Sequence, residues 1–169
     1  MTRLVQLPNV LLACVLLVFC CGSLQAKTLP EVRVGVVTRV VDGDTLWVRS
    51  DNVLLKVRVT GIDAPEICQS WGVESREALK RRALGQPVTV TYQRFDDYGR
   101  LLGRVDLGNE DLGRWMVSQG HAWSYAYRNY PGAYAAEQRS AMDLRLGLFA
   151  QAAPEVPRQF RKRHGSCFP

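Results

Sequence analysis

The chain has 169 residues, a length that favours a single domain. Its apolar fraction of 47% supplies a hydrophobic core, and its charged fraction of 22% excludes wholesale disorder. The formal net charge of +6 suits a polyanionic partner such as nucleic acid or an acidic membrane surface, although solubility alone also explains a basic balance.

The N-terminal segment, residues 1–26, has the layout of a secretory signal peptide. Arg3 supplies a basic start, residues 10–20 are an unbroken apolar run, and residues 23–26 include the small side chains at which a signal peptidase cuts. The apolar run is short for a membrane span. We therefore expect cleavage before Lys27, export to the periplasm or the medium, and no stable membrane association afterwards. An uncleaved N-terminal anchor is the alternative.

Export determines what the cysteines can do. Three of the 5 cysteines leave with the signal peptide, so Cys68 and Cys167 remain. In an oxidising compartment such a pair predicts a disulfide, with two free thiols as the alternative. The disulfide would tie a basic C-terminal tail, residues 154–169, back to a domain formed by residues 27–153.

Three strands are predicted at the start of this domain. Residues 32–41 are rich in β-branched side chains, and Asp42-Gly43 is a strong hairpin signal before a return strand at 45–49. Residues 54–60 alternate between apolar and polar side chains, which places Arg58 on the polar face.

Further helices and strands follow, and they suffice for a small barrel. Helix-forming residues with apolar side chains at helical spacing predict helices, and alternating apolar and polar side chains predict strands. The predicted elements, in chain order, are helix 73–84, strand 88–92, strand 101–107, helix 112–119 and helix 133–146. The tail, residues 154–169, shows no periodicity. Five short strands with about three helices packed outside predict an α+β fold, a closed barrel of the OB type.

Three carboxylates lie at the ends of predicted strands. Asp44 stands in a DGDT turn that a hairpin explains by itself, but Asp63 and Glu66 place two carboxylates at the end of another strand. Carboxylate and backbone carbonyl oxygens are the ligands that Ca²⁺ prefers. Asp44, Asp63 and the carbonyl of Ala64 are therefore candidate metal ligands, which leaves Glu66 to accept a proton as general base.

Two arginines complete the candidate site. Attack on a phosphodiester builds negative charge on oxygens that guanidinium groups match well. Arg58 stands in the strand leading to Asp63, and Arg100 follows a turn at residues 96–99, although either alone is explained as a surface charge. A regular strand would point Arg58 and Asp63 to opposite faces, so we predict a bulge near Gly61.

In this order and spacing the motifs resemble the thermonuclease (staphylococcal-nuclease-like) family, from about residue 37 to residue 149. The matching segments are Asp42-Gly43-Asp44-Thr45, Arg58, Asp63-Ala64-Pro65-Glu66, Asp97-Tyr98-Gly99-Arg100 and Gln119-Gly120. The resemblance implies a Ca²⁺-dependent endonuclease for DNA and RNA that leaves 5′-hydroxyl and 3′-phosphate ends. It implies a metal held by Asp44, Asp63 and the Ala64 carbonyl, a general base in Glu66, and transition-state stabilisation by Arg58 and Arg100.

An aromatic segment is a candidate for contacts with the substrate. Trp123, Tyr125 and Tyr127 alternate and are followed by Arg128, and aromatic faces interleaved with cations stack bases and neutralise phosphate. By resemblance, Tyr125 and Tyr127 lie beside the nucleotide. Tyr98 is a further candidate for contact with the nucleic acid. We expect Trp123 to cover the barrel instead.

Two other functions fit part of the sequence. One is a catalytically silent nucleic-acid-binding module on the same fold, and the other is an exported protein-binding domain. The complete set of acidic residues and arginines favours the enzyme, which we expect to be a monomer. The basic residues of the tail predict either non-specific phosphate contacts or simple solvation, and they are Arg158, Arg161, Lys162 and Arg163.

Overall fold

The computed structural model describes residues 29–167, so the predicted signal peptide lies outside the described residues. The strands are β1 Glu31–Val40, β2 Thr45–Ser50, β3 Val53–Val59, β4 Ile62–Asp63, β5 Pro87–Phe95, β6 Leu101–Leu107, β7 Glu110–Asp111 and β8 Trp123–Ser124. The helices are α1 Gly72–Ala83, α2 Leu112–Ser118, α3 Ala135–Asp143, the 3-10 turn η1 Gly147–Ala150, and α4 Pro157–His164. In this part of the chain no helix has the length and apolar character needed to cross a membrane.

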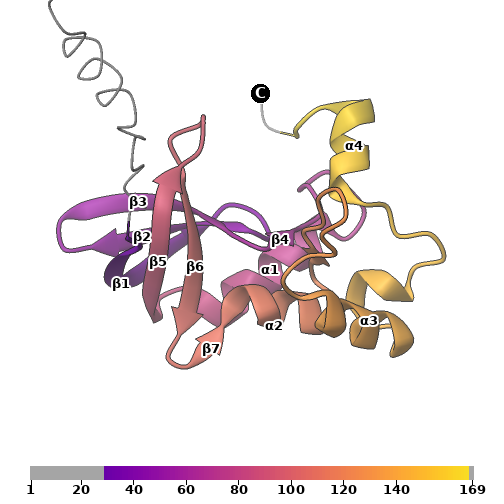
Figure 1. Cartoon of the computed structure of the whole chain (residues 1–169), viewed down its shortest axis with the longest axis horizontal. Coiled ribbons are helices and arrows are strands. Elements are labelled where there is room, and N and C mark those ends of the chain that lie inside the picture. The colour runs from indigo at the N-terminus through magenta and orange to yellow at the C-terminus, as the bar shows by residue number, and fades with distance from the viewer. Residues whose placement is uncertain (1–28, 168–169) are drawn as a thin grey trace, which may run out of the picture.

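The main sheet closes on itself. Its strand order is β3-β2-β1-β5-β6-β7, and β3 also pairs with β6 in parallel. Because this pairing joins opposite sides of the sheet, β1, β2, β3, β5 and β6 form a mixed barrel, which confirms the α+β fold of OB type. Figure 1 shows the barrel on the left, with the helices below it and to its right.

The core fills the barrel and continues under the helices. Alternation along the strands turns branched side chains inward, and α1 and α2 add Leu79 and Met116 to the same cluster. Burial of each such side chain is worth about 1.5–3 kcal/mol, so the barrel is a rigid support for the loops at its end. Its most completely buried strand residues are Leu46, Val48, Val57, Val59, Val90, Leu101 and Val105.

The third predicted helix is shorter than expected. α3 ends at Asp143, and Arg145 takes a positive φ of 51°, which turns the chain out of the helix before η1. Phe149 of η1 packs edge-on against Trp123 with ring centroids 5.0 Å apart. Trp123 therefore packs in a helix-side cluster and not over the barrel core that we expected it to cover.

The C-terminal segment is not a featureless tail, because residues 157–164 form α4. Pro157 stands in the first turn, where a missing N–H is tolerated and the fixed φ suits a helix. The amide of Gln69 donates to the carbonyl of Glu155 at 2.7 Å, just before the helix. After the helix, the predicted disulfide joins Cys167 to Cys68, with Cα atoms 5.8 Å apart. Both ends of α4 are thus tied to the loop before α1.

Candidate active site

Asp44 lies in the turn between β1 and β2 and is held through both carboxylate oxygens. The Oδ2 atom accepts the backbone N–H of Ala64 at 2.9 Å, and Oδ1 accepts the hydroxyl of Thr45 at 3.1 Å. The backbone carbonyl of Asp44 accepts the N–H of Val59 at 2.8 Å. These bonds fix the hairpin against the end of β3 and the loop after β4, and they leave Asp44 only 6% exposed.

Gly43 allows this hairpin to lie against α1. A Cβ atom at position 43 would stand 1.9 Å from Oγ of Ser75 and 2.7 Å from Cβ of Ala64. No side chain larger than hydrogen fits there without displacing its neighbours. The DGDT segment is therefore both a turn and a close contact between the barrel and the helix.

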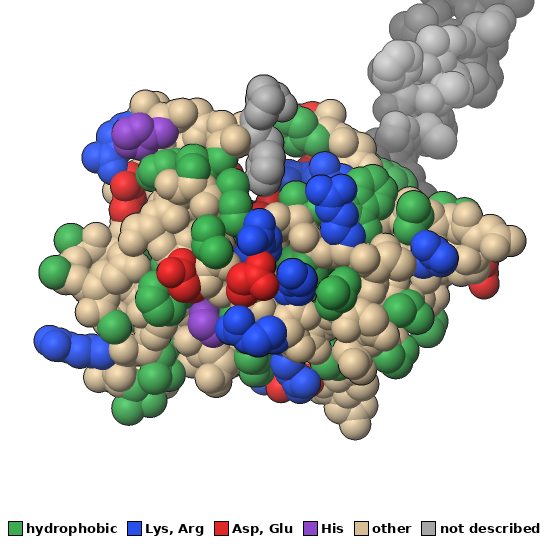
Figure 2. All heavy atoms as spheres, turned by 180° about the vertical axis from the view of Figure 1, so that it is seen from behind, with side chains coloured by type: hydrophobic (Ala, Val, Ile, Leu, Met, Phe, Trp, Pro, Cys, Tyr) green, Lys and Arg blue, Asp and Glu red, His purple; other side chains and the backbone are tan. Residues whose placement is uncertain are grey.

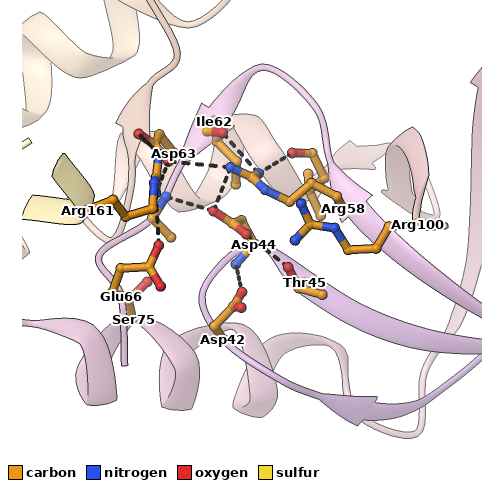
Figure 3. A network of polar contacts seen from close by, with 12 residues as sticks. Asp42, Asp44, Thr45, Arg58, Ile62, Asp63, Glu66, Ser75, Arg100 and Arg161 are labelled. Atoms are coloured by element: carbon orange, nitrogen blue, oxygen red, sulfur yellow. Dashed lines mark hydrogen bonds and ion pairs between the residues drawn. The ribbon is translucent and has the colours of Figure 1, made fainter. Parts of the chain in front are cut away.

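Arg58 and Asp63 come together as predicted, but a turn and not a bulge brings them there. β3 ends before Gly61, whose φ of 81° reverses the chain into β4. Nη1 of Arg58 donates to the carbonyl of Ile62 at 3.1 Å. Nη2 lies 3.0 Å from Oδ2 of Asp44 and 3.4 Å from Oδ1 of Asp63 (Figure 3). One guanidinium thus joins both acidic strand ends.

Glu66 is positioned through its backbone. Its N–H donates to Oε1 of Gln69 at 3.2 Å, and its carbonyl accepts the N–H of Gln69 at 2.8 Å. A Cβ atom on Gly72 would stand 1.8 Å from the Glu66 carbonyl oxygen, so the start of α1 lies directly against this residue. The sequence reading did not identify Gln69, and no motif around it indicates its role.

Arg161 of α4 closes the acidic cluster, a position that the sequence reading missed. Its Nη1 atom lies 2.9 Å from Oε1 of Glu66 and 3.1 Å from Oδ1 of Asp63, and Nη2 lies 3.2 Å from Oδ2 of Asp63. These partners are 95 and 98 residues away along the chain. The one available signal is the predicted disulfide of Cys68 with Cys167, which brings the tail back to this loop.

Arg100 enters from the turn between β5 and β6. Its Nε atom donates to Oδ2 of Asp96 at 2.7 Å, and its guanidinium lies over the ring of Tyr98 at 5.4 Å. β6 runs parallel to β3 with Leu102 opposite Arg58, so the two arginines lie on one side of the cluster (Figure 3). Burial raises the pKa of Asp96, but hydrogen bonds from the backbone and from Arg100 outweigh it, and the net pKa is lowered. Asp96 is therefore a charged anchor for Arg100.

The acidic groups crowd one another in a partly buried site. Burial, followed by the charge of Asp44, raises the pKa of Asp42 to about 7. Burial also raises the pKa of Asp63, although Arg161 and Arg58 oppose that rise. Asp42 and Asp63 are thus difficult to ionise without a nearby positive charge, which is the electrostatic setting of a cation site.

The donor set fits a hard dication. Asp44, Asp63 and the backbone carbonyl of Ala64 supply oxygens of the kind that Ca²⁺ takes. Across residues 29–167, no three His, Cys, Asp or Glu side chains lie close enough to hold a metal by themselves. A metal here would rely on two carboxylates, a backbone carbonyl and water. The guanidinium groups of Arg58 and Arg161 now supply the positive charge that these carboxylates require.

The predicted substrate-binding aromatic residues are exposed on segments that adjoin elements of the site. β8 pairs with β4, the strand that ends at Asp63, and the chain continues from β8 into Tyr125 and Tyr127, which are 41% and 47% exposed. The guanidinium of Arg128 lies over the ring of Tyr127 at 5.3 Å. Tyr98 is 83% exposed in the turn before Arg100. Figure 2 shows acidic side chains bordered by Lys and Arg side chains on one face of the molecule.

Comparison with known proteins places most of this site in one family. The chain matches the staphylococcal nuclease homologue family over residues 56–151. This range includes Arg58, Asp63, Glu66 and Arg100, whereas Asp44 and Arg161 lie outside it.

Individual relatives match over most of their length. A protein of Escherichia coli O157:H7 described as an uncharacterized endonuclease is 37% identical over 130 residues, which is 76% of this chain and 85% of the relative. A protein of Haemophilus influenzae with the same description is 32% identical over 156 residues, or 92% of this chain and 86% of the relative. A micrococcal nuclease of Shigella flexneri is 34% identical over 139 residues, or 76% and 80% of the two chains.

Proposed function

This chain belongs to the staphylococcal nuclease family, and we propose that it is an exported, Ca²⁺-dependent endonuclease that cuts DNA and RNA to leave 3′-phosphate ends. Membership of the family makes it a nuclease, a hydrolase that acts on nucleic acid. The choice of metal, the product ends and export are the parts that we propose. The observation that carries the metal-dependent site is the meeting of Arg58 with Asp44 and Asp63 at 3.0 and 3.4 Å, beside Glu66.

We assign the metal to Asp44, Asp63 and the backbone carbonyl of Ala64. Bound Ca²⁺ would supply positive charge to the phosphate and to the attacking water. Both carboxylates are fixed before a metal arrives, since Asp44 is bonded to the Ala64 N–H and Asp63 to Arg58. The protein therefore spends little conformational entropy in presenting them.

Glu66 is the proposed general base. It takes a proton from water as the water oxygen bonds to phosphorus, and the bond from phosphorus to the 5′-oxygen breaks. The leaving 5′-oxygen takes a proton from solvent water, which gives a 5′-hydroxyl and a 3′-phosphate. The hydrogen bonds of the Glu66 backbone with the N–H and the side-chain Oε1 of Gln69 hold this residue at the edge of the acidic cluster.

Arg58 and Arg100 are the proposed phosphate ligands in the transition state. Arg58 is anchored by the Ile62 carbonyl, and Arg100 is anchored by Asp96. Both guanidinium groups are therefore preorganised for the phosphate. The adjoining bases would stack on exposed rings with a neighbouring cation. The residues that we assign to this stacking are Tyr98, Tyr125, Tyr127 and Arg128.

Digestion of single-stranded DNA and of RNA tests the activity. We expect cleavage with Ca²⁺ that stops when a chelator is added, and fragments whose 5′ ends accept phosphate from a polynucleotide kinase without prior phosphatase treatment. Equal cleavage with and without chelator would refute the metal. Salt-dependent binding without cleavage under either condition would favour the silent binding module.

Export is proposed from the signal-peptide layout, with residues 27–153 as the nuclease domain and residues 154–169 as a C-terminal segment in a monomeric protein. The disulfide between Cys68 and Cys167 suits the oxidising compartment that export implies. Mass spectrometry of the protein recovered from a bacterial host should show an N-terminus at Lys27. A mature protein that keeps residues 1–26 would contradict cleavage.

A further inference from the structure

The proposed metal site already holds a cation, and it is a side chain of the same protein. One guanidinium, that of Arg161, contacts both carboxylate oxygens of Asp63, at 3.1 and 3.2 Å. It also contacts Oε1 of Glu66 at 2.9 Å. Figure 3 shows Arg161 reaching these two residues from the side opposite Arg58. The proposed metal ligand and the proposed base are therefore engaged by the same group.

Arg161 and a dication cannot both use these oxygens. Burial opposes the charge of Arg161, but hydrogen bonds to Asp63 and Glu66 outweigh it and raise the pKa of the guanidinium, so this group stays charged. A divalent ion on the Asp63 oxygens would lie within a few ångströms of that charge, in a site where Asp63 is only 3% exposed and screening is weak. Arg161 occupies both oxygens of Asp63, so it competes directly with a metal for them.

The C-terminal segment is fastened so that Arg161 stays nearby. Ser70 donates its hydroxyl to Oε1 of Gln151 at 3.1 Å, ahead of the tie between Gln69 and Glu155. The disulfide then closes the far end of the segment. Such a tether raises the effective concentration of Arg161 at the acidic cluster above what the chain connection alone would give.

The contact is particular to one residue of α4. Arg158 and Lys162 of the same helix are exposed, whereas Arg161 is turned toward the acidic cluster and half-buried. A helix held merely by its net positive charge would have no reason to direct this one guanidinium at both Asp63 and Glu66.

We propose that Arg161 is a built-in competitor for the divalent cation, so that metal binds only when Arg161 leaves Asp63 and Glu66. This inference rests on the proposed function, because it takes Asp63 as a metal ligand and Glu66 as the base. The Cys68–Cys167 disulfide sets the strength of the competition by keeping α4 close. The site is closed where divalent cations are scarce and opens as their concentration rises.

Calorimetric titration of the metal-free mature protein with Ca²⁺ tests this competition without any need for activity. Arg161→Gln should bind Ca²⁺ about tenfold to a hundredfold more tightly than the wild type, the factor expected for a lost charge-assisted contact. Lys162→Gln is the matched control, because it removes the same charge from the next residue, and it should stay within about threefold of the wild type.

A second variant keeps every arginine. Cys68→Ser combined with Cys167→Ser loosens the tether and should also tighten Ca²⁺ binding, by less than Arg161→Gln does. Hydrogen exchange of the α4 peptide in the wild type provides a direct readout, because Ca²⁺ should displace the helix and speed exchange there.

The outcomes separate this inference from the function on which it rests. Equal or weaker Ca²⁺ binding by Arg161→Gln, or exchange in α4 that Ca²⁺ leaves unchanged, would overturn the competition while the metal assignment stands. Absence of Ca²⁺ binding to both the wild type and Arg161→Gln would overturn the metal assignment, and the competition with it.

Discussion

The Oδ2 oxygen of Asp44 accepts the backbone N–H of Ala64 at 2.9 Å, a bond that joins the β1–β2 hairpin to the loop after β4. Ala64 is 3% exposed, so its N–H has no ready access to water if this partner is lost. Asp44 therefore has two separable properties, an acceptor that stabilises the fold and a charge that we assign to the metal. Two substitutions can distinguish them.

Asp44→Asn retains a side-chain oxygen for the Ala64 N–H, whereas Asp44→Ala retains none. The alanine variant should have a free energy of unfolding about 1–3 kcal/mol lower than that of the asparagine variant, because a buried donor is left unpaired. Both should lose Ca²⁺ binding in a calorimetric titration. Equal urea-unfolding curves for the two variants would show that the bond to Ala64 contributes nothing.

Glu66→Gln keeps the shape of the side chain but removes its capacity to take a proton. We expect kcat on single-stranded DNA to fall by about 10²- to 10⁴-fold. Ca²⁺ affinity should not weaken, since Glu66 is assigned to the base and not to the metal. Glu74→Gln, on the exposed face of α1, is the matched control and should leave kcat unchanged. A Glu66→Gln enzyme within tenfold of the wild type would remove Glu66 from the role of base.

Gly43→Ala tests the contact between the hairpin and α1. The added methyl group would meet Ser75 Oγ at 1.9 Å, and we expect overpacking to lower the free energy of unfolding by about 1–3 kcal/mol. Activity should fall with it, because Asp44 is the next residue. Gly113→Ala is the control, since its nearest neighbour would stand at 3.3 Å and alanine favours α2. Equal thermal unfolding temperatures for the two variants would argue against the close contact between Gly43 and α1.

Local patterns predicted the barrel because its strands are defined by alternation and turn residues. The approach of Arg58 to Asp63 was also predictable, since chemistry required both at one site. Whether a bulge or a turn at Gly61 brings them together was not predictable. The choice depends on the hydrogen-bond partner of the Thr60 backbone. Its N–H donates to the carbonyl of Gly103 at 2.9 Å, a contact with β6 that no local pattern reveals.

The C-terminal segment was beyond local prediction for a different reason. α4 is mostly basic and carries no apolar stripe, so its sequence is that of a solvated tail. Its position depends on Cys68, and its contact depends on Arg161 reaching Asp63 across 98 residues. The raised pKa of Asp42 was also beyond local prediction, because it arises from burial beside Asp44 in the folded hairpin.

Tyr127→Ala tests the aromatic platform. In the background of Glu66→Gln, which slows cleavage, loss of the ring should weaken binding of a short single-stranded oligonucleotide by about 1–3 kcal/mol. Tyr127→Phe keeps the stacking face and should bind as the parent does. Fluorescence anisotropy at fixed salt measures both. An alanine variant with the affinity of the phenylalanine variant would place the nucleotide elsewhere.

His121 gives the stability of the fold a dependence on pH. Burial, followed by the charge of Arg81, lowers the pKa of His121 below its usual 6.5. The Nδ1 atom accepts the indole N–H of Trp71 at 3.3 Å, a bond that a proton on Nδ1 would break. The folded protein therefore keeps His121 neutral at pH values where the unfolded chain takes up a proton.

The sign of the effect follows from that difference in bound protons. The stability that His121 contributes is fully present above pH 6.5 and is lost as the pH falls through the lower pKa of the folded state. The contribution of His121 to the change of unfolding free energy with pH cannot exceed about 1.4 kcal/mol per pH unit, the limit for one proton. His121→Asn keeps an acceptor near Nδ1 and should flatten urea-derived stability between pH 7 and 5. A variant whose stability falls as steeply as that of the wild type would assign the acid sensitivity to other groups.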